Sequence, residues 1–284
     1  MGWCIMPRGI PFSPRTEIGQ NFLVDRNLPR IIVEDAGICP GETVLEIGPG
    51  KGVLTKALLD SPCGRLDAVE LDRRLAPFLE PYQKNEPQRF FLHWGDAVRF
   101  DYSSLPPPTG VVANIPYHIT TPLIWKILED LAPQGLSRLV LMIQKEAALR
   151  LAAPPRSKAR YPLGVTLELM GGVQILRPVP PEAFRPIPRV DSALVRIDLK
   201  AHRDLPAIAS WRELLRRAFG ERRKMLRNSL EGLPLPLACP SWETCLEALG
   251  LPTTSRPEEL DGEAWIELWR SLEGTKRPSG APSA

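Results

Sequence analysis

Four residues near the middle of the chain, Asn114-Ile115-Pro116-Tyr117, follow an apolar run and have groups suited to holding a purine base. The exocyclic N6 of adenine is a poor nucleophile because its lone pair is delocalised into the ring, so a catalyst must align it. The Asn114 side-chain oxygen and the Ile115 carbonyl oxygen can each accept an N6–H hydrogen bond. Pro116 would stiffen the turn, and Tyr117 offers a ring for base stacking. The alternative interpretation is an ordinary turn.

A glycine-rich turn earlier in the chain is suited to a ligand that contains a nucleoside. Residues 44–47 are apolar apart from Glu46, and Gly48-Pro49-Gly50-Lys51-Gly52 follows directly. Glycines at the carboxyl end of a first strand let the backbone approach a ligand closely. Glu70 comes about 20 residues further on, where a carboxylate can hold ribose hydroxyls. An ordinary tight connection is the alternative.

The nature of the ligand follows from how this turn differs from a dinucleotide-binding motif. In Gly-x-Gly-x-x-Gly the helix N-terminus receives a pyrophosphate, whereas here the third glycine comes one residue early. The acid Glu46 before the turn favours a cationic ligand without phosphate, such as S-adenosylmethionine. Asp96, after another apolar run, can accept a hydrogen bond from an adenine amino group or can simply cap a turn.

The composition limits other kinds of chemistry. The five cysteines are scattered without a Cys-x-x-Cys pair and there are only three histidines, so we expect neither a metal site nor a disulfide framework. No apolar run approaches the roughly 18 residues of a membrane span, and the N-terminus lacks the apolar segment of a signal peptide. We therefore expect a cytoplasmic protein that does not associate with membranes.

Positive charge is concentrated in part of the chain. The whole chain has 36 Lys and Arg against 33 Asp and Glu, a net charge of +3, but residues 185–230 hold twelve basic residues against five acids. Residues 145–160 form a second basic cluster. Arginine forks suit phosphate binding and base stacking, so the distribution favours a nucleic-acid partner. A solvated helix face is the alternative.

The elements that would position these residues alternate between strands and helices. We expect strands at residues 43–47, 66–71, 90–94, 110–113, 139–143, 173–176 and 193–199, and helices at 24–36, 52–60, 73–80, 121–131, 145–152 and 162–170. This alternation predicts an α/β fold with a mostly parallel sheet. After Lys200 only helical spacing remains. We expect flexible tails at 1–18 and 275–284, an α/β domain at 19–203 and a helical domain at 204–274.

Several motifs together resemble the rRNA adenine N6,N6-dimethyltransferases. They are Gly19-Gln-Asn-Phe-Leu23, Glu46–Gly52, Glu70, Gly95-Asp-Ala97 and Asn114–Tyr117. Residues 144–146, 184–193 and 219–230 are similar to the KsgA-type branch of this family, which acts on small-subunit (16S) rRNA. The family usually has Leu in place of Ile115. Since the role there belongs to the backbone carbonyl, we expect little consequence.

The resemblance implies a Rossmann-like methyltransferase fold, with helices on both faces of the sheet, and S-adenosylmethionine as cofactor. It implies cofactor binding by Asn21, Leu23, Gly48, Glu70, Asp96 and Asn114. The catalytic residues would be Asn114, Ile115, Pro116 and Tyr117, and Tyr117 and Phe184 would be aromatic faces for the target base. For Phe184, a core aromatic is the alternative interpretation. In the helical domain, Arg222, Arg223, Lys224 and Arg227 can contact rRNA phosphates, or they can be solvated or paired with Glu213 and Glu221.

The resulting hypothesis is dimethylation of two adjacent adenines near the 3′ end of small-subunit rRNA, by a monomeric enzyme acting on a pre-ribosomal particle, with a role in subunit biogenesis. One alternative is a large-subunit rRNA adenine methylase of the macrolide-resistance type, in which Ile also occurs at the position of Ile115. The basic segment at 222–230 favours the small-subunit branch. Another alternative is a non-catalytic RNA-binding assembly factor, which the intact Asn114 and Tyr117 argue against.

Overall fold

The computed structural model describes residues 12–15, 19–200, 208–221, 224–235 and 239–273. The chain divides into two compact units. The first, Met1–Leu149 with Gly171–Ala201, is called the sheet unit below, and the second, Arg150–Met170 with His202–Ala284, is called the helical unit. The predicted tails at 1–18 and 275–284 lie outside the described residues, apart from residues 12–15. Among the described residues, no helix is long and apolar enough to span a membrane.

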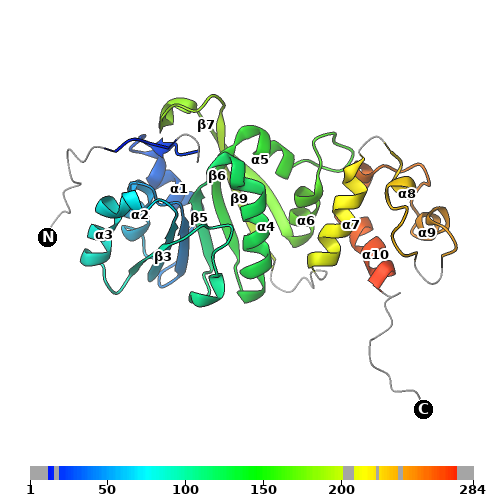
Figure 1. The fold of residues 1–284 in the computed structure, drawn as a ribbon, viewed down its shortest axis with the longest axis horizontal. Coiled ribbons are helices and arrows are strands. Elements are labelled where there is room, and N and C mark those ends of the chain that lie inside the picture. The colour runs from blue at the N-terminus through cyan, green and yellow to red at the C-terminus, as the bar shows by residue number, and fades with distance from the viewer. Residues whose placement is uncertain (1–11, 16–18, 201–207, 222–223, 236–238, 274–284) are drawn as a thin grey trace, which may run out of the picture. The chain divides into compact units, whose positions relative to one another are not determined.

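The sheet unit contains a seven-stranded sheet of order β4-β3-β2-β5-β6-β9-β7 (Figure 1). Its strands are β2 Thr43–Ile47, β3 Arg65–Glu70, β4 Phe90–Trp94, β5 Gly110–Asn114, β6 Arg138–Gln144, β7 Gly171–Val179 and β9 Ser192–Leu199. The strands from β4 to β6 pair in parallel, while β9 is antiparallel to both β6 and β7. The predicted mostly parallel sheet is therefore confirmed, and the carboxyl ends of β2, β3, β4 and β5 share one edge.

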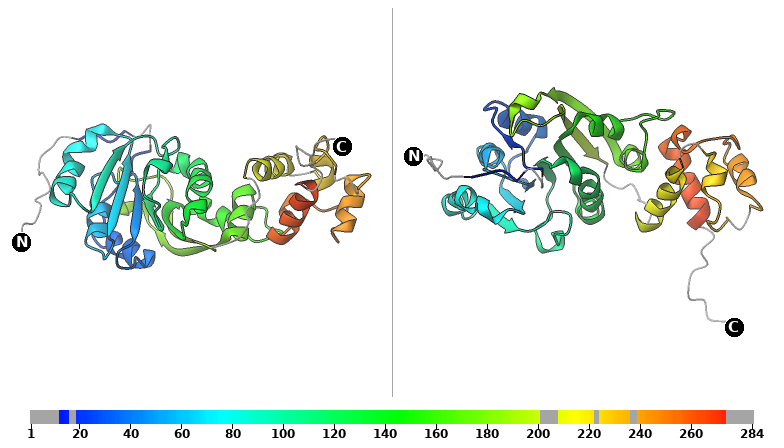
Figure 2. Two further views of the ribbon diagram at one scale, coloured as in Figure 1. Left: turned by 90° about the horizontal axis from the view of Figure 1, so that it is seen from below. Right: turned by 45° about the horizontal axis from the view of Figure 1, so that its top comes forward.

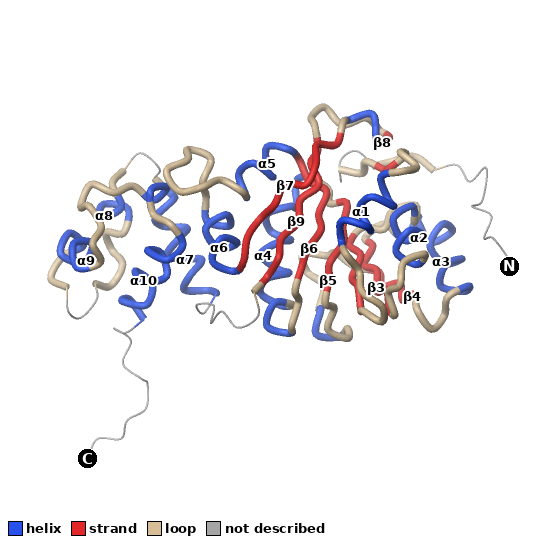
Figure 3. Tube along the Cα trace, turned by 180° about the vertical axis from the view of Figure 1, so that it is seen from behind, coloured by secondary structure: helices blue, strands red, loops and turns tan. Residues whose placement is uncertain are grey.

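Helices cover both faces of this sheet, as predicted. Figures 1 and 3 view the molecule from opposite sides, with α4 in front of the sheet in the first and α1 in front in the second. The helices of the unit are α1 Leu28–Ala36, α2 Val53–Leu59, α3 Ala76–Asn85, α4 Thr120–Asp130 and α5 Lys145–Leu151. On the α1 side, Leu28 and Ile32 belong to one buried apolar cluster with Val44, Val112 and Val140 of the strands. This burial drives the layers together.

A second, two-stranded sheet was not predicted from the sequence. In it, β1 Phe22–Leu23 pairs antiparallel with β8 Phe184–Arg185, with Leu23 opposite Phe184. Strands of two residues are too short to show a period in the hydrophobic pattern. The pairing fixes the N-terminal segment around residues 19–23 to a part of the chain about 160 positions away.

The helical unit includes a segment that the sequence assigned to the α/β domain. Its helices are α6 Pro162–Met170, α7 Ile208–Gly220, α8 Leu226–Ser229, α9 Trp242–Ala248 and α10 Gly262–Glu273 (Figure 2). The Trp211 indole donates a hydrogen bond to Thr166 Oγ1 at 2.9 Å, and the Gly262 amide donates one to Glu168 Oε1 at 3.0 Å. The predicted boundary near residue 203 assigned α6 to the α/β domain, whereas the structure groups α6 with the helical unit. The reason is that α6 is apolar almost all round and packs against α7 and α10.

Candidate active site

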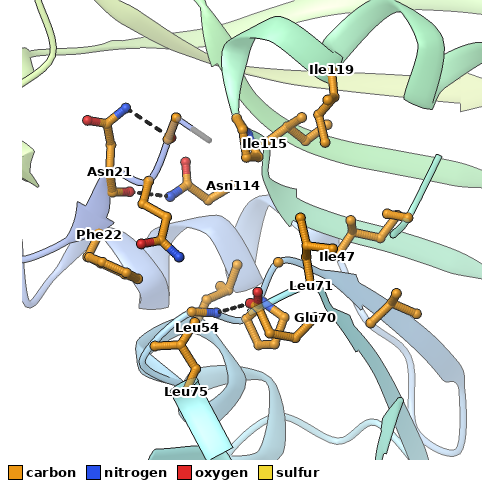
Figure 4. Close-up of a pocket in the computed structure, with 18 of the residues that line it drawn as sticks. Asn21, Phe22, Ile47, Leu54, Glu70, Leu71, Leu75, Asn114, Ile115 and Ile119 are labelled. Atoms are coloured by element: carbon orange, nitrogen blue, oxygen red, sulfur yellow. Dashed lines mark hydrogen bonds between the residues drawn. The ribbon is translucent and has the colours of Figure 1, made fainter. Parts of the chain in front are cut away.

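A pocket lies at the shared carboxyl edge of the parallel strands (Figure 4). Its lining comes from the N-terminal segment and from the ends of β2, β3, β4 and β5. The lining residues are Gly19–Leu23, Ile47–Lys51, Val53, Leu54, Val69–Leu71, Leu75, Gly95–Ala97 and Asn114–Ile119. All six residues predicted to bind the cofactor and all four predicted to be catalytic are among them. Ligands of open α/β sheets bind at this edge.

The glycine turn has a backbone conformation that other residues adopt with difficulty. Gly48, Gly50 and Gly52 have φ of 69°, 59° and 78°, in the left-handed region. A Cβ atom on Gly52 would also lie 2.6 Å from the Tyr82 ring, closer than real Cβ contacts allow. The turn therefore requires glycine for both its conformation and its space, and it brings bare backbone to the pocket.

Glu70 is held at the end of β3 by two backbone amides. Its Oε2 accepts a hydrogen bond from the Gly50 amide at 3.1 Å, and its Oε1 accepts one from the Asp72 amide at 2.9 Å. The side chain is largely buried, and this burial raises the pKa of the Glu70 carboxyl. Each oxygen keeps a lone pair for a further donor, so the carboxylate can accept hydroxyl hydrogen bonds in the pocket.

Asn114 is oriented by the N-terminal segment. Its Nδ2 donates a hydrogen bond to the Asn21 carbonyl oxygen at 3.1 Å, so the amide nitrogen is used and the Oδ1 remains as an acceptor (Figure 4). The approach of this segment depends on Gly19, at φ 70°, because a Cβ atom there would lie 3.1 Å from the His118 ring and 3.3 Å from Pro116. Ile115 has a buried side chain, and its amide donates to the Met142 carbonyl at 3.1 Å.

Asp96 lines the pocket at the end of β4 and also caps its own turn. The Val98 amide donates to its Oδ1 at 2.9 Å. The two interpretations of Asp96 are therefore compatible, because one carboxylate oxygen accepts the backbone amide while the other keeps its acceptor capacity.

Glu46 does not border the pocket as the sequence suggested. The side chain is 1% exposed and is absent from the lining, and its Oε2 accepts a hydrogen bond from the Thr55 hydroxyl at 2.7 Å. Burial raises the pKa of Glu46 to about 8. The group is therefore mostly protonated at neutral pH, so the carboxylate in the lining next to the glycine turn is Glu70.

Phe184 is placed as the alternative interpretation, a core aromatic, predicted, and not as an aromatic face for the target base. Its side chain is 1% exposed and lies in the apolar cluster with Leu23, Val179 and Ala183, and it does not line the pocket. A base cannot stack on a ring that is covered in this way. The β1–β8 pairing places Phe184 opposite Leu23, and both side chains belong to one buried apolar cluster.

The predicted RNA-binding cations belong to the helical unit. Arg222 and Arg223 lie outside the described residues. Lys224 forms an ion pair with Glu221, and Arg227 Nη1 lies 3.0 Å from Glu243 Oε1. The sequence left open a pairing of these cations with Glu213 or Glu221, and the Lys224–Glu221 contact agrees with it. The partner of Arg227, Glu243, was not expected.

Some residues around the pocket were not recognised from the sequence. The Lys51 ammonium lies 5.2–5.5 Å from the ring centroids of Phe12, Phe22 and Phe78. Phe12 and Phe78 are too far from the glycine turn in sequence for any spacing rule to link them to it. Lys51 itself lines the pocket, and cation–π contacts of this kind help to fix the position of its ammonium.

A sheet of this topology, with a glycine turn, a strand-end acid and an Asn-x-Pro-Tyr segment at one edge, places the protein in the Rossmann-like class of methyltransferases. Residues 12–235 match the family model described as ribosomal RNA adenine dimethylase, and the chain belongs to this family. The predicted enzyme class, its rRNA substrate and its cofactor, S-adenosylmethionine, are confirmed by this membership.

Similar proteins support the assignment. The chain is 40% identical over 265 residues to the ribosomal RNA small subunit methyltransferase A of Ruegeria sp. (strain TM1040), covering 92% of each chain. It is 39% identical over 261 residues to the protein of that name from Rubrobacter xylanophilus, covering 91% of this chain and 95% of the relative. A dimethyladenosine transferase structure from Plasmodium falciparum superposes with a TM-score of 0.77 at 26% identity, covering 89% of this chain and 98% of the other.

Proposed function

We propose that this enzyme dimethylates N6 of two adjacent adenines near the 3′ end of small-subunit rRNA, as a monomer acting on a pre-ribosomal particle in the cytoplasm. The relatives named small subunit methyltransferase A support the choice of subunit, because the similarity runs over nine-tenths of both chains. The family membership supplies the reaction, and the pocket supplies residues suited to it.

The observation that carries the proposal is the orientation of Asn114. Because its Nδ2 donates to the Asn21 carbonyl, its Oδ1 is the atom available to an incoming base. An N6–H group is a donor, so it can bond to Asn114 Oδ1 and to the Ile115 carbonyl oxygen at the same time. Two acceptors would align the N6 lone pair and favour the pyramidal form that develops as N6 attacks. Tyr117 would stack on the extruded base.

The cofactor would occupy the part of the pocket next to the glycine turn, where it supplies the methyl group as an electrophile. Glu70 would accept hydrogen bonds from its ribose hydroxyls, and Asp96 would accept one from its adenine amino group. Gly48 would permit close approach of the backbone, while Asn21 and Leu23 would cover the cofactor from the N-terminal segment. The acidic groups in the lining suit a ligand with a positive sulfonium and no phosphate.

A large-subunit substrate is the second candidate. A 23S rRNA methyltransferase structure, ErmE, superposes on 89% of this chain with a TM-score of 0.65 at 26% identity, covering all of that structure. The fold and site alone therefore fit either subunit.

Mass spectrometry of rRNA tests this proposal. Small-subunit and large-subunit particles from cells that lack the gene would each be incubated with the enzyme and labelled S-adenosylmethionine, with Asn114→Ala as the inactive control. We expect two dimethylated adenines in one small-subunit fragment. Label found in large-subunit rRNA instead would overturn the choice of subunit, and a single labelled adenine would overturn the adjacent pair.

A further inference from the structure

Tyr117 makes a hydrogen bond outside the pocket that neither the family membership nor the proposed chemistry requires. Its hydroxyl oxygen lies 2.7 Å from Ser192 Oγ. Tyr117 lines the pocket, whereas Ser192 is fully buried at the first position of β9 and does not line it. A hydrogen bond to a phenolic oxygen is made at the edge of the ring. It therefore restrains the tyrosine and leaves its faces free for a base.

The two partners differ in how firmly the fold holds them. Ser192 lies opposite Gln144 of β6 and opposite Val179 of β7, so ladders on both sides fix its backbone. Tyr117 begins a single 3₁₀ turn, Tyr117–Ile119, and is only half-buried. Two side-chain torsions would let its ring turn in the pocket. The hydrogen bond thus ties the less constrained side chain to the more constrained one.

We propose that Ser192 is a positioning residue, which holds the Tyr117 ring in the orientation that receives the target adenine. This inference depends on the proposed role of Tyr117 in base stacking. A ring that is ordered before binding does not lose its freedom when the base arrives, so the ordering cost is removed from base capture. Ser192 contacts neither cofactor nor base in this arrangement and acts through Tyr117 alone.

Two substitutions remove the same hydrogen bond from opposite sides. Ser192→Ala deletes the serine hydroxyl and Tyr117→Phe deletes the phenolic hydroxyl, while both keep the aromatic ring. We expect each to raise KM for the rRNA substrate several-fold, with about a tenfold loss in kcat/KM, and to leave S-adenosylmethionine affinity unchanged. The double variant should be no worse than either single variant, since both delete one interaction. A 2-aminopurine at the target position should report weaker base extrusion by its fluorescence.

A matched control separates positioning from stability. Ser61 also lies in the sheet unit without lining the pocket, and its hydroxyl donates a hydrogen bond to the Leu58 carbonyl at 2.6 Å and accepts one from the Cys63 amide at 3.3 Å. Ser61→Ala should lose stability comparably and keep wild-type kinetics. If Ser192→Ala does not fold, Tyr117→Phe decides alone, because its ring and backbone are unchanged.

Three outcomes separate the positioning role of Ser192 from the stacking role of Tyr117. Wild-type kinetics in Tyr117→Phe and Ser192→Ala, with Tyr117→Ala impaired, would overturn the positioning role and keep the stacking role. Wild-type base capture in Tyr117→Ala would overturn both. Additive losses in the double variant would show that the two hydroxyls act separately, which also contradicts the proposal.

Discussion

Polar groups at the pocket edge and cations in the helical unit are held in different ways. Around the pocket, Glu70 and Asn114 bond to backbone atoms of the glycine turn and the N-terminal segment, whose positions follow from the sheet and from the β1–β8 pairing. In the helical unit, Lys224 and Arg227 pair with exposed acids. Arg216 and Arg217 both bond to Glu213, and these bonds, first that of Arg216, lower its pKa to about 2.

This difference in how side chains are held explains why the sequence predicts the pocket residues better than the RNA-binding cations. The position of a polar residue at the end of a parallel strand is fixed by the sheet, so its chemistry can be interpreted directly from the sequence. A cation on a helix can face RNA or a neighbouring acid, and exposed pairs contribute at most about 1 kcal/mol, so either partner is accessible. Substitutions should therefore have large effects in the core and at the pocket, and the smallest effects at an exposed cation.

Substitutions of Phe184 test whether this residue belongs to the apolar core or to the pocket. Because the ring is buried, Phe184→Ala should lower the free energy of unfolding by about 3–5 kcal/mol. Phe184→Leu keeps an apolar side chain but removes the flat ring, so it should retain methyl transfer at temperatures where it is folded. Denaturant titration and single-turnover assays measure the two effects. A stable Phe184→Leu variant with transfer reduced tenfold or more would restore the stacking role.

Asn114 should show the largest catalytic effect. Asn114→Ala removes an acceptor for N6–H without touching the apolar core, and we expect transfer to fall on the order of 100-fold or more. Circular dichroism would establish that the variant is folded. Turnover of labelled S-adenosylmethionine on rRNA near the wild-type rate would contradict the role given to Asn114.

The strands and the residues at their ends were predictable because long buried runs and glycine turns are local signals. The strand predicted at 90–94 matches β4 to the residue, and the residues of the Asn114–Tyr117 segment line one pocket with Glu70, as the parallel order requires. The sequence allowed Phe184 to be either a core aromatic or a stacking face and could not decide between them, because a two-residue strand pairing leaves no hydrophobic period. The contact between Tyr117 and Ser192 joins residues 75 positions apart and has no periodic signature.

The position of Glu46 was not predictable for a different reason. Strand alternation says that Glu46 and Ile47 point to opposite faces, but it does not say which face reaches the pocket. The structure places Ile47 in the lining and Glu46 in the core beside Thr55. An acid next to a glycine turn is therefore weaker evidence for a charged site than an acid at the strand end, where Glu70 lies.

Glu70 should control cofactor affinity. Glu70→Ala removes acceptors for ribose hydroxyls, and hydrogen bonds to charged groups contribute roughly 1.5–3 kcal/mol each, so S-adenosylmethionine should bind at least about tenfold more weakly. RNA affinity should be unchanged. Calorimetry would compare it with Glu80→Ala, which removes an exposed acid of α3. Unaltered affinity in a folded Glu70→Ala variant would place the ribose elsewhere.

Glu46 should make stability depend on pH. Its folded-state pKa of about 8 lies above the ordinary value of 4.5 for a glutamate, so between these pH values the folded state binds more protons than the unfolded state. The free energy of unfolding should therefore fall as pH rises from about 5 to 8, with a slope of at most about 1.4 kcal/mol per pH unit. Glu46→Gln should remove this part of the slope. Denaturant midpoints at several pH values check it, and parallel profiles for variant and wild type would contradict it.

The smallest expected effect concerns Lys224. If it contacts an rRNA phosphate, Lys224→Gln should flatten the dependence of log affinity on log salt by about 0.7–0.9 for the lost contact, and cofactor affinity should stay the same. Glu221→Gln is the matched control, because it breaks the same ion pair but keeps the cation, so its salt slope should not flatten. The same assay on Arg222→Gln and Arg223→Gln extends the test to the neighbouring arginines.

Equal salt slopes for wild type and both Lys224 and Glu221 variants would mean that Lys224 only pairs with its neighbouring acid. The cation cluster at residues 145–160 would then be the better candidate for RNA contact, beginning with Lys145. That residue is half exposed and lies 3.4 Å from Asp191 Oδ2, a weak pairing that a phosphate can replace. Lys145→Gln would show the flattening that Lys224→Gln lacks, which would move the RNA surface from the segment around Lys224 to this cluster. Lys145 belongs to the sheet unit, whereas the cations of the cluster from Arg150 onward belong to the helical unit.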